Sequence, residues 1–214
     1  MNYNRPLISI LLATYNRAKY LPRSITSVIN QSYPHWELLV LDDGSTDNTT
    51  AVVGAFIKRD RRIQLVSLHH CGPWVTKNHG LGCARGQLIT FIDSDDEYLA
   101  SHLERRVAYL ARHATVDLIH GGLEIIGDHY VVDKDDMSKK IHLSRCVVGG
   151  TIFARQSIFQ KVKGFKNLPF ASDADLVSRC QKQEMTIRRV RFPTYRYYRT
   201  TPDSITVRLA QQSV

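Results

Sequence analysis

Apolar runs and amphipathic stretches alternate along the first half of the chain. Four short apolar runs are typical of buried strands, at residues 7–13, 36–41, 63–68 and 87–92. Apolar side chains recur at helical spacing in three stretches between them, after Pro22, after residues 45–50 and at residues 76–84. Because strands that alternate with helices form βαβ units, we predict an α/β fold with a mostly parallel sheet.

The second half of the chain has shorter elements. Ser101 and Glu104 have the spacing of a capping box, which predicts the start of a helix. Beyond residue 114 the pattern predicts strands at residues 118–121, 130–132, 147–153 and 186–198. It also predicts one helix at residues 172–183. We expect a mixed or antiparallel arrangement here, with the charged residues 133–140 as a mobile loop.

Length and cysteine content narrow the class of protein. The 214 residues suit one domain that spans residues 1–214. No apolar stretch approaches the roughly 20 residues that a membrane helix needs, and the first residues lack the apolar core of a secretion signal. The four cysteines form no close pair and no ligand-spaced set, which argues against zinc and disulfides and favours the cytoplasm.

The chain is basic, with a net charge of +9 from 29 Lys and Arg against 20 Asp and Glu. This excess favours phosphate-bearing partners such as nucleotides, nucleic acid or anionic lipid. Residues 182–208 hold seven basic and two acidic residues, interleaved with Phe and Tyr. That composition suits a platform for single-stranded nucleic acid, but strand periodicity favours aromatic rings that pack inward. We also expect weak peripheral contact with an anionic membrane through this segment.

Carboxylates gather directly after two of the predicted strands. Asp42 and Asp43 follow the second strand, and Asp93, Asp95 and Asp96 follow the fourth. Because the carboxyl ends of parallel strands meet at one edge of a sheet, we expect both groups to line one cleft. Like charges packed this closely are relieved by a divalent cation with oxygen ligands. The pattern therefore predicts a cation and an anionic ligand.

Four motifs appear in order along the chain, at residues 8–17, 42–47, 78–86 and 91–96. With Gly164–Phe165 and residues 172–176, they resemble the inverting glycosyltransferases of family two, which have the GT-A fold. The resemblance implies a Rossmann-like, mostly parallel central sheet flanked by helices, with a smaller mixed second half. It also implies a nucleotide-sugar-binding half at about residues 1–114 and an acceptor-binding half at about residues 115–214.

The reaction implied by this resemblance moves a sugar from a nucleotide-diphospho-sugar, with UDP as the favoured nucleotide, to a hydroxyl group. The acceptor would be a glycan or a lipid-linked molecule, and the protein would work in the cytoplasm or at the inner face of the membrane. The resemblance does not specify the sugar, the linkage or the oligomeric state.

The resemblance also assigns roles to individual residues. Asp95 would hold Mn²⁺ or Mg²⁺ on the diphosphate, and Asp93 would contact the ribose region of the donor. Asp43 would accept the imide N–H of uracil while Tyr15 stacks on the base, and Asp42 would hold the turn. Further donor contacts are assigned to Ala13, Thr14, Arg17, Lys77 and Ser94. By its chemistry alone, the stretch at residues 42–47 is also typical of a turn followed by a helix cap.

Asp173 is the candidate catalytic base. A positioned carboxylate that deprotonates the attacking hydroxyl raises the rate by roughly 10² to 10⁴. The family commonly has Glu-Asp here, whereas this chain has Ser172 before Asp173, which leaves the acceptor and full activity less constrained. We favour an enzyme with no nucleic-acid partner. Four other interpretations stay open: Asp173 and Asp175 stabilising a helix dipole, a non-catalytic nucleotide-sugar-binding or scaffolding subunit, a nucleic-acid-binding module, and a glycosidase that uses paired carboxylates.

Overall fold

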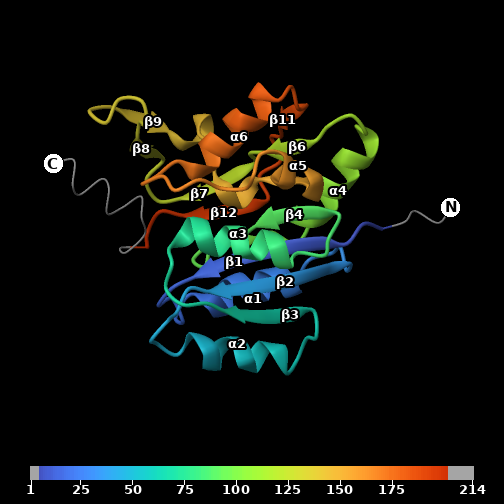
Figure 1. Cartoon of the computed structure of the whole chain (residues 1–214), viewed down its shortest axis with the longest axis vertical. Coiled ribbons are helices and arrows are strands. Elements are labelled where there is room, and N and C mark those ends of the chain that lie inside the picture. Colours follow the sequence, from blue (N-terminus) through green and yellow to red (C-terminus); the bar gives the residue numbers. More distant parts are fainter. Residues whose placement is uncertain (1–4, 202–214) are drawn as a thin grey trace.

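The computed structural model describes residues 5–201, and its centre is a seven-stranded sheet of order β11-β6-β10-β4-β1-β2-β3 (Figure 1). The strands are β1 (Ile8–Thr14), β2 (Trp36–Asp42), β3 (Ile63–Ser67), β4 (Leu88–Phe91), β6 (Leu118–His120), β10 (Phe153–Arg155) and β11 (Ile187–Arg189). All neighbouring strands pair in parallel, except that β10 is antiparallel to both β4 and β6. The predicted α/β fold with a mostly parallel sheet is therefore confirmed.

Helices cover both faces of this sheet, as Figure 1 shows. One face packs against α1 (Leu21–Ile29), α2 (Thr49–Ile57) and α4 (His102–Arg112), and the other against α3 (Pro73–Cys83), α5 (Gln156–Lys161) and α6 (Ser172–Lys182). Successive side chains of a strand point to opposite faces, so Ile10 and Leu12 enter the first core and Leu11 enters the second. Burial on both faces explains why the sequences of these strands are continuous apolar runs.

A smaller mixed part is built mostly from residues that follow α4, as expected. Strands β5 (Glu97–Tyr98), β12 (Tyr195–Tyr198) and β7 (Leu123–Ile126) form a three-stranded sheet, and β8 (Tyr130–Val132) pairs with β9 (Lys140–His142) as a hairpin. Two short 3₁₀ helices follow, at Leu143–Arg145 and Gly149–Thr151. The aromatic rings of the late basic segment pack inward: Tyr195 is buried, and Phe192 lies beneath the guanidinium groups of Arg105 and Arg106. Residues 202–208 of that segment lie outside the described residues.

Two local predictions are wrong. The apolar run at residues 147–153 is not a strand, because its two glycines form a 3₁₀ turn and β10 begins only at Phe153. The capping box is absent as well: Ser101 occupies the N-cap position without a side-chain cap, and the Glu104 carboxylate accepts the hydroxyl of Ser32 at 2.7 Å. In both places a contact distant in sequence replaces the local pattern.

Helices of the described part of the chain are short. The longest have 11 residues, and none is long and apolar enough to cross a membrane.

Candidate active site

The carboxyl ends of β1, β2 and β4 carry the polar loops to one edge of the sheet. Thr14 and Asp42 are paired in register at the ends of β1 and β2, and the carbonyl of Thr14 accepts the amide of Asp43 at 2.9 Å. Ala13 pairs with Leu41 one residue earlier. The strand pairing thus brings the loop after β1 against the loop after β2.

Hydrogen bonds of Asn16 hold these two loops together. Its backbone adopts a φ of 53°, a conformation that Asn tolerates better than most residues. Its side-chain oxygen accepts the amide of Thr46 at 2.8 Å, and its own amide donates to Ser45 Oγ at 2.8 Å. Asp42 accepts the Ser45 amide at 3.0 Å, so its predicted role in holding the turn is confirmed. These contacts fix the backbone on which Tyr15 and Asp43 stand.

Tyr15 and Asp43 form one corner of the site together with His70, which follows β3. The Tyr15 ring is 41% exposed and stacks on the His70 imidazole, with ring centroids 4.2 Å apart. Asp43 is buried, and its carboxylate accepts the backbone amides of Cys71 and Gly72 at 2.9 and 3.1 Å. Burial alone would raise the pKa of Asp43, but the hydrogen bonds of this loop lower it below its ordinary value.

Four of the predicted residues meet beyond the end of β4 in what we call the acidic cluster: Lys77, Asp93, Asp95 and Asp173. The ammonium of Lys77 lies 3.3 Å from Asp173 Oδ1, and Asp95 lies 3.6 Å from the guanidinium of Arg17. Arg17 belongs to the same loop as Tyr15, so this loop connects the two corners of the site. The contact between Lys77 and Asp173 joins residues that are 96 positions apart in the chain.

The charges of the acidic cluster perturb one another. Burial raises the pKa of Asp93 to about 6, and the negative charges of Asp95 and Asp173 add to the rise while Lys77 opposes it. Burial would lower the pKa of Lys77, but the charges of Asp173 and Asp93 raise it, so this side chain remains a cation. Titratable groups perturbed in this way are typical of functional sites.

The acidic cluster fits a divalent cation. Its donors are carboxylate oxygens, the ligands that Mg²⁺ prefers, and Asp95 and Asp173 both place negative charge near Asp93. Within residues 5–201 no three His, Cys, Asp or Glu side chains form a metal cage by themselves. The residues therefore suit an ion held by one or two carboxylates and completed by the phosphates of a ligand.

Asp96 and Tyr195 support this cluster, and the sequence placed Asp96 among its carboxylates but did not reveal the contact between these two side chains. The Tyr195 hydroxyl donates to Asp96 Oδ2 at 2.7 Å and accepts the amide of Asp93 at 3.2 Å. Asp96 also accepts the amide of Tyr198 at 2.9 Å, which ties strand β12 to the loop after β4. Ser94, another predicted donor contact, is buried within the same loop.

Asp173 lies in the first turn of α6 and faces the 3₁₀ turn that contains Gly149. A Cβ added at Gly149 would lie 2.7 Å from both carboxylate oxygens of Asp173, and one at Gly150 would lie 2.0 Å from the Tyr195 hydroxyl. Only glycine allows the backbone to approach both side chains this closely. The adjacent glycines were a sequence signal for such an approach, but the flanking apolar residues suggested a strand instead.

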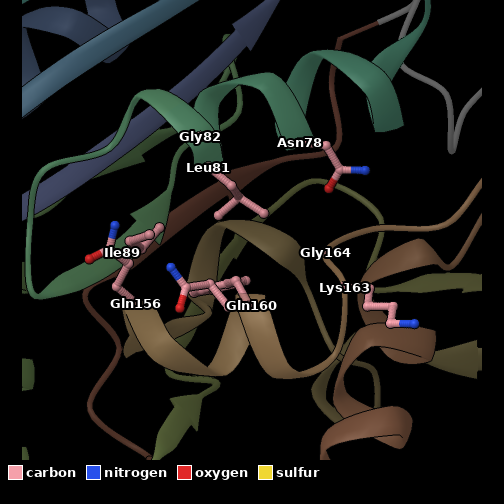
Figure 2. Close-up of a pocket in the computed structure, with 9 residues that line it drawn as sticks. Asn78, Leu81, Gly82, Ile89, Gln156, Gln160, Lys163 and Gly164 are labelled. Atoms are coloured by element: carbon pink, nitrogen blue, oxygen red, sulfur yellow. The ribbon is translucent and has the colours of Figure 1, made fainter.

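A separate pocket of about 450 Å³ lies between α3 and α5 (Figure 2). Leu81 points from α3 toward α5, from which Gln156 and Gln160 extend. Asn78 lies at one end, where its side-chain amide holds both backbone groups of Phe165 at 2.8 Å. None of the described lining residues is acidic, so this pocket is distinct from the acidic cluster.

Comparison with known proteins identifies the family of this chain. The model of Glycosyl transferase family 2 matches residues 9–173, which include both loops and the acidic cluster. The chain belongs to glycosyl transferase family 2. An Escherichia coli member named UDP-Glc:alpha-D-GlcNAc-diphosphoundecaprenol beta-1,3-glucosyltransferase WfgD is 36% identical over 148 residues, covering 67% of this chain and 57% of that protein.

Comparison with solved glycosyltransferase structures shows that the fold is GT-A. S. aureus TarS 1–349 in complex with UDP-GlcNAc superposes with a TM-score of 0.78 and 21% identity, over 92% of this chain and 60% of that one. The mannosyltransferase PcManGT from Pyrobaculum calidifontis in complex with GDP-Man and Mn²⁺ gives a TM-score of 0.73 and 19% identity, over 91% and 57%. The chain spans about half the length of the curated relatives it matches.

Proposed function

We propose that this chain is an inverting, metal-dependent glycosyltransferase that uses a nucleotide-diphospho-sugar, with UDP as the favoured nucleotide. The observation that carries the proposal is the acidic cluster, in which a half-buried lysine and three carboxylates meet at the carboxyl edge of the sheet of a family 2 chain. Because the matched relatives are longer, the activity proposed here is that of this chain's own site.

The donor would lie across the two corners of the site. Tyr15 offers an aromatic face for the base, and the nearby Asp43 carboxylate offers an acceptor for its N–H groups. The diphosphate would then reach the acidic cluster, where Asp95 would hold Mn²⁺ or Mg²⁺ and Asp93 would contact the ribose region of the donor. When bound, the ion would offset the negative charge that develops on the departing diphosphate. Lys77 would supply a second, fixed positive charge beside it.

Asp173 is the group that we assign to proton transfer. Its Oδ1 is paired with Lys77, and the carboxylate is 23% exposed, so an acceptor hydroxyl can reach it. In a single displacement the hydroxyl oxygen bonds to the anomeric carbon as the bond to the diphosphate oxygen breaks, and Asp173 takes the hydroxyl proton. Attack from the face opposite the leaving group inverts the configuration.

The acceptor that we propose is a glycan or a lipid-linked saccharide. The name of the Escherichia coli relative specifies a diphosphoundecaprenol acceptor, and that of another relative, TuaG of Bacillus subtilis, specifies teichuronic acid biosynthesis. A lipid-linked acceptor would bring the protein to a membrane surface. Arg188, Arg189 and Arg191 are exposed at and beside the edge strand β11 and would provide a basic surface for that contact.

The test combines donor binding with turnover. Thermal unfolding with UDP should show stabilisation that depends on Mn²⁺ or Mg²⁺, because a ligand that binds only the folded state raises its stability. Asp95→Ala should abolish this dependence. Asp173→Asn should lower kcat by roughly two orders of magnitude with donor affinity nearly retained.

Asp175 provides a matched control on the same helical turn. It is paired with Arg179 at 2.8 Å, so Asp175→Asn removes the same charge from the helix N-terminus without touching the acidic cluster. We expect near-wild-type kcat from this variant. Equal activity of both Asn variants would refute the catalytic assignment of Asp173. Nucleotide binding without turnover on any acceptor would instead identify a non-catalytic binding subunit. Ser172, which stands where the family commonly has Glu, is the sequence feature that favours this alternative.

A further inference from the structure

The His70 side chain lies where the site would be expected to receive the base of the donor. Its ring stacks on Tyr15 with centroids 4.2 Å apart and planes inclined by 22°. Its Nδ1 is 2.8 Å from Asp43 Oδ2, within hydrogen-bonding distance. A flat ring that stacks on Tyr15 and hydrogen-bonds to Asp43 makes the same two contacts that a nucleobase would make there.

The Asp43 carboxylate has no lone pair to spare for a further donor. Oδ1 is contacted by the Cys71 amide at 2.9 Å, the Cys71 thiol at 3.2 Å and the Thr76 hydroxyl at 2.9 Å, while Oδ2 is contacted by the Gly72 amide at 3.1 Å and by His70. A carboxylate offers about four lone-pair positions, and these contacts fill them even if the single proton of the Thr76 hydroxyl goes to the Gly72 carbonyl, which also lies 2.9 Å away. A base N–H can therefore bind Asp43 only after one of these contacts has left.

His70 is the contact that can leave most easily. Its side chain is 57% exposed, whereas the Asp43 side chain is 5% exposed. The two amides belong to the backbone of the loop that begins α3, and Thr76 is buried within that helix. The His70 ring also covers the Tyr15 ring, with centroids 4.2 Å apart, which leaves no room for a third ring between them.

We propose that His70 is a gate over the nucleobase subsite, which the base of the nucleoside diphosphate must displace in order to bind. This proposal rests on the proposed function, since it requires a nucleotide donor. Displacement exchanges one stacked, hydrogen-bonded ring for another. The closed position of His70 lowers the apparent affinity by the fraction of molecules in which the gate is open. His70 thereby sets the donor affinity without touching the reacting atoms.

Removal of the ring should tighten nucleotide binding. A partly exposed hydrogen bond together with one ring stack corresponds to a closed state favoured roughly three- to tenfold. Isothermal titration calorimetry should therefore give a Kd for UDP, in the presence of Mg²⁺, that is roughly three- to tenfold lower for His70→Ala than for the wild type. His69→Ala is the matched control, because His69 is an exposed neighbouring histidine.

A ligand without a base separates the gate from other effects. Pyrophosphate with Mg²⁺ should bind the wild type and His70→Ala equally, because it reaches only the acidic cluster. In NMR spectra of the wild type, the ring protons of His70 should lose the ring-current shift caused by Tyr15 when UDP is added.

The following results would refute the proposal that His70 is a gate. An equal or higher Kd for UDP in His70→Ala would show that the imidazole does not compete with the base, and tightening of both ligands would show that the effect does not concern the base. If the wild type bound neither UDP nor any other nucleoside diphosphate, the proposed function itself would fail. Binding that is unaffected by the variant would refute the gate alone.

Discussion

Gly149 is the position where one methyl group tests the catalytic assignment most directly. An alanine Cβ there would lie 2.7 Å from both carboxylate oxygens of Asp173, whereas ordinary van der Waals contact begins at 3.4 Å. The difference requires the carboxylate to move by roughly 0.7 Å, and a misplacement of about 1 Å at a reacting group can cost about 10²-fold in rate. We therefore expect Gly149→Ala to lower kcat on the order of tenfold to hundredfold.

The assay is nucleotide release under donor saturation, with the KM of the donor measured in parallel. The KM should change little, because the methyl group contacts Asp173 rather than the donor corner. Gly54→Ala is the matched control: nothing lies within 4 Å of its added Cβ, and alanine in the interior of α2 should stabilise the fold by about 0.5–1 kcal/mol.

A double variant tests whether Gly149→Ala acts through Asp173. If Gly149→Ala acts through Asp173, it should cost little further activity in an Asp173→Asn background, because two changes to one catalytic group are not additive. A folded Gly149→Ala protein with kcat within about twofold of the wild type, or fully additive losses in the double variant, would refute the reasoning.

Two further predictions concern side chains that hold the site and the sheet. Tyr195→Phe removes the hydroxyl between Asp96 and Asp93, so urea unfolding should show a loss of about 1–3 kcal/mol, and unchanged stability would exclude this role. Glu37→Gln should lower the free energy of unfolding at neutral pH, because the Glu37 carboxylate binds Ser9 and Arg85. Burial alone would raise the pKa of Glu37, but these hydrogen bonds lower it below its ordinary value. The cost should be full above the ordinary pKa of about 4.5 and should disappear as the pH falls through the lowered pKa, which unfolding midpoints at pH 7 and about pH 3 can check.

The strands, the helices between them and the position of the acidic residues could be predicted because they depend on local pattern. Ile10, Leu11 and Leu12 are apolar on both faces of β1, which only a buried strand in a layered fold explains. Once the strands are parallel, their carboxyl ends must meet. The placement of Asp43 and Asp93 near one sheet edge then follows from chain geometry alone.

The details that the sequence did not reveal are contacts between side chains far apart in the chain. Glu104 was expected to cap its own helix, but Ser32, 72 residues away, supplies a closer partner. His70 reaches Asp43 across 27 residues and gives no sequence signal, because nothing in a histidine pair indicates which neighbour it will contact. The strand β5 has only two residues, too few to show any periodicity.

Charge balance explains why a donor and a cation should share this site. The carboxylates Asp93, Asp95 and Asp173 face the two cations Lys77 and Arg17, which leaves one negative charge in excess. Burial is the main cause of the raised pKa of Asp93, and the negative charges of Asp95 and Asp173 add to the rise while Lys77 opposes it. A diphosphate adds further negative charge to the same few ångströms, so the donor that we propose is repelled unless a divalent cation enters with it. Lys77 alone is insufficient, because its charge is already shared between Asp173 and Asp93. The metal dependence that we propose therefore rests on the total charge of the acidic cluster rather than on a preformed cage of ligands.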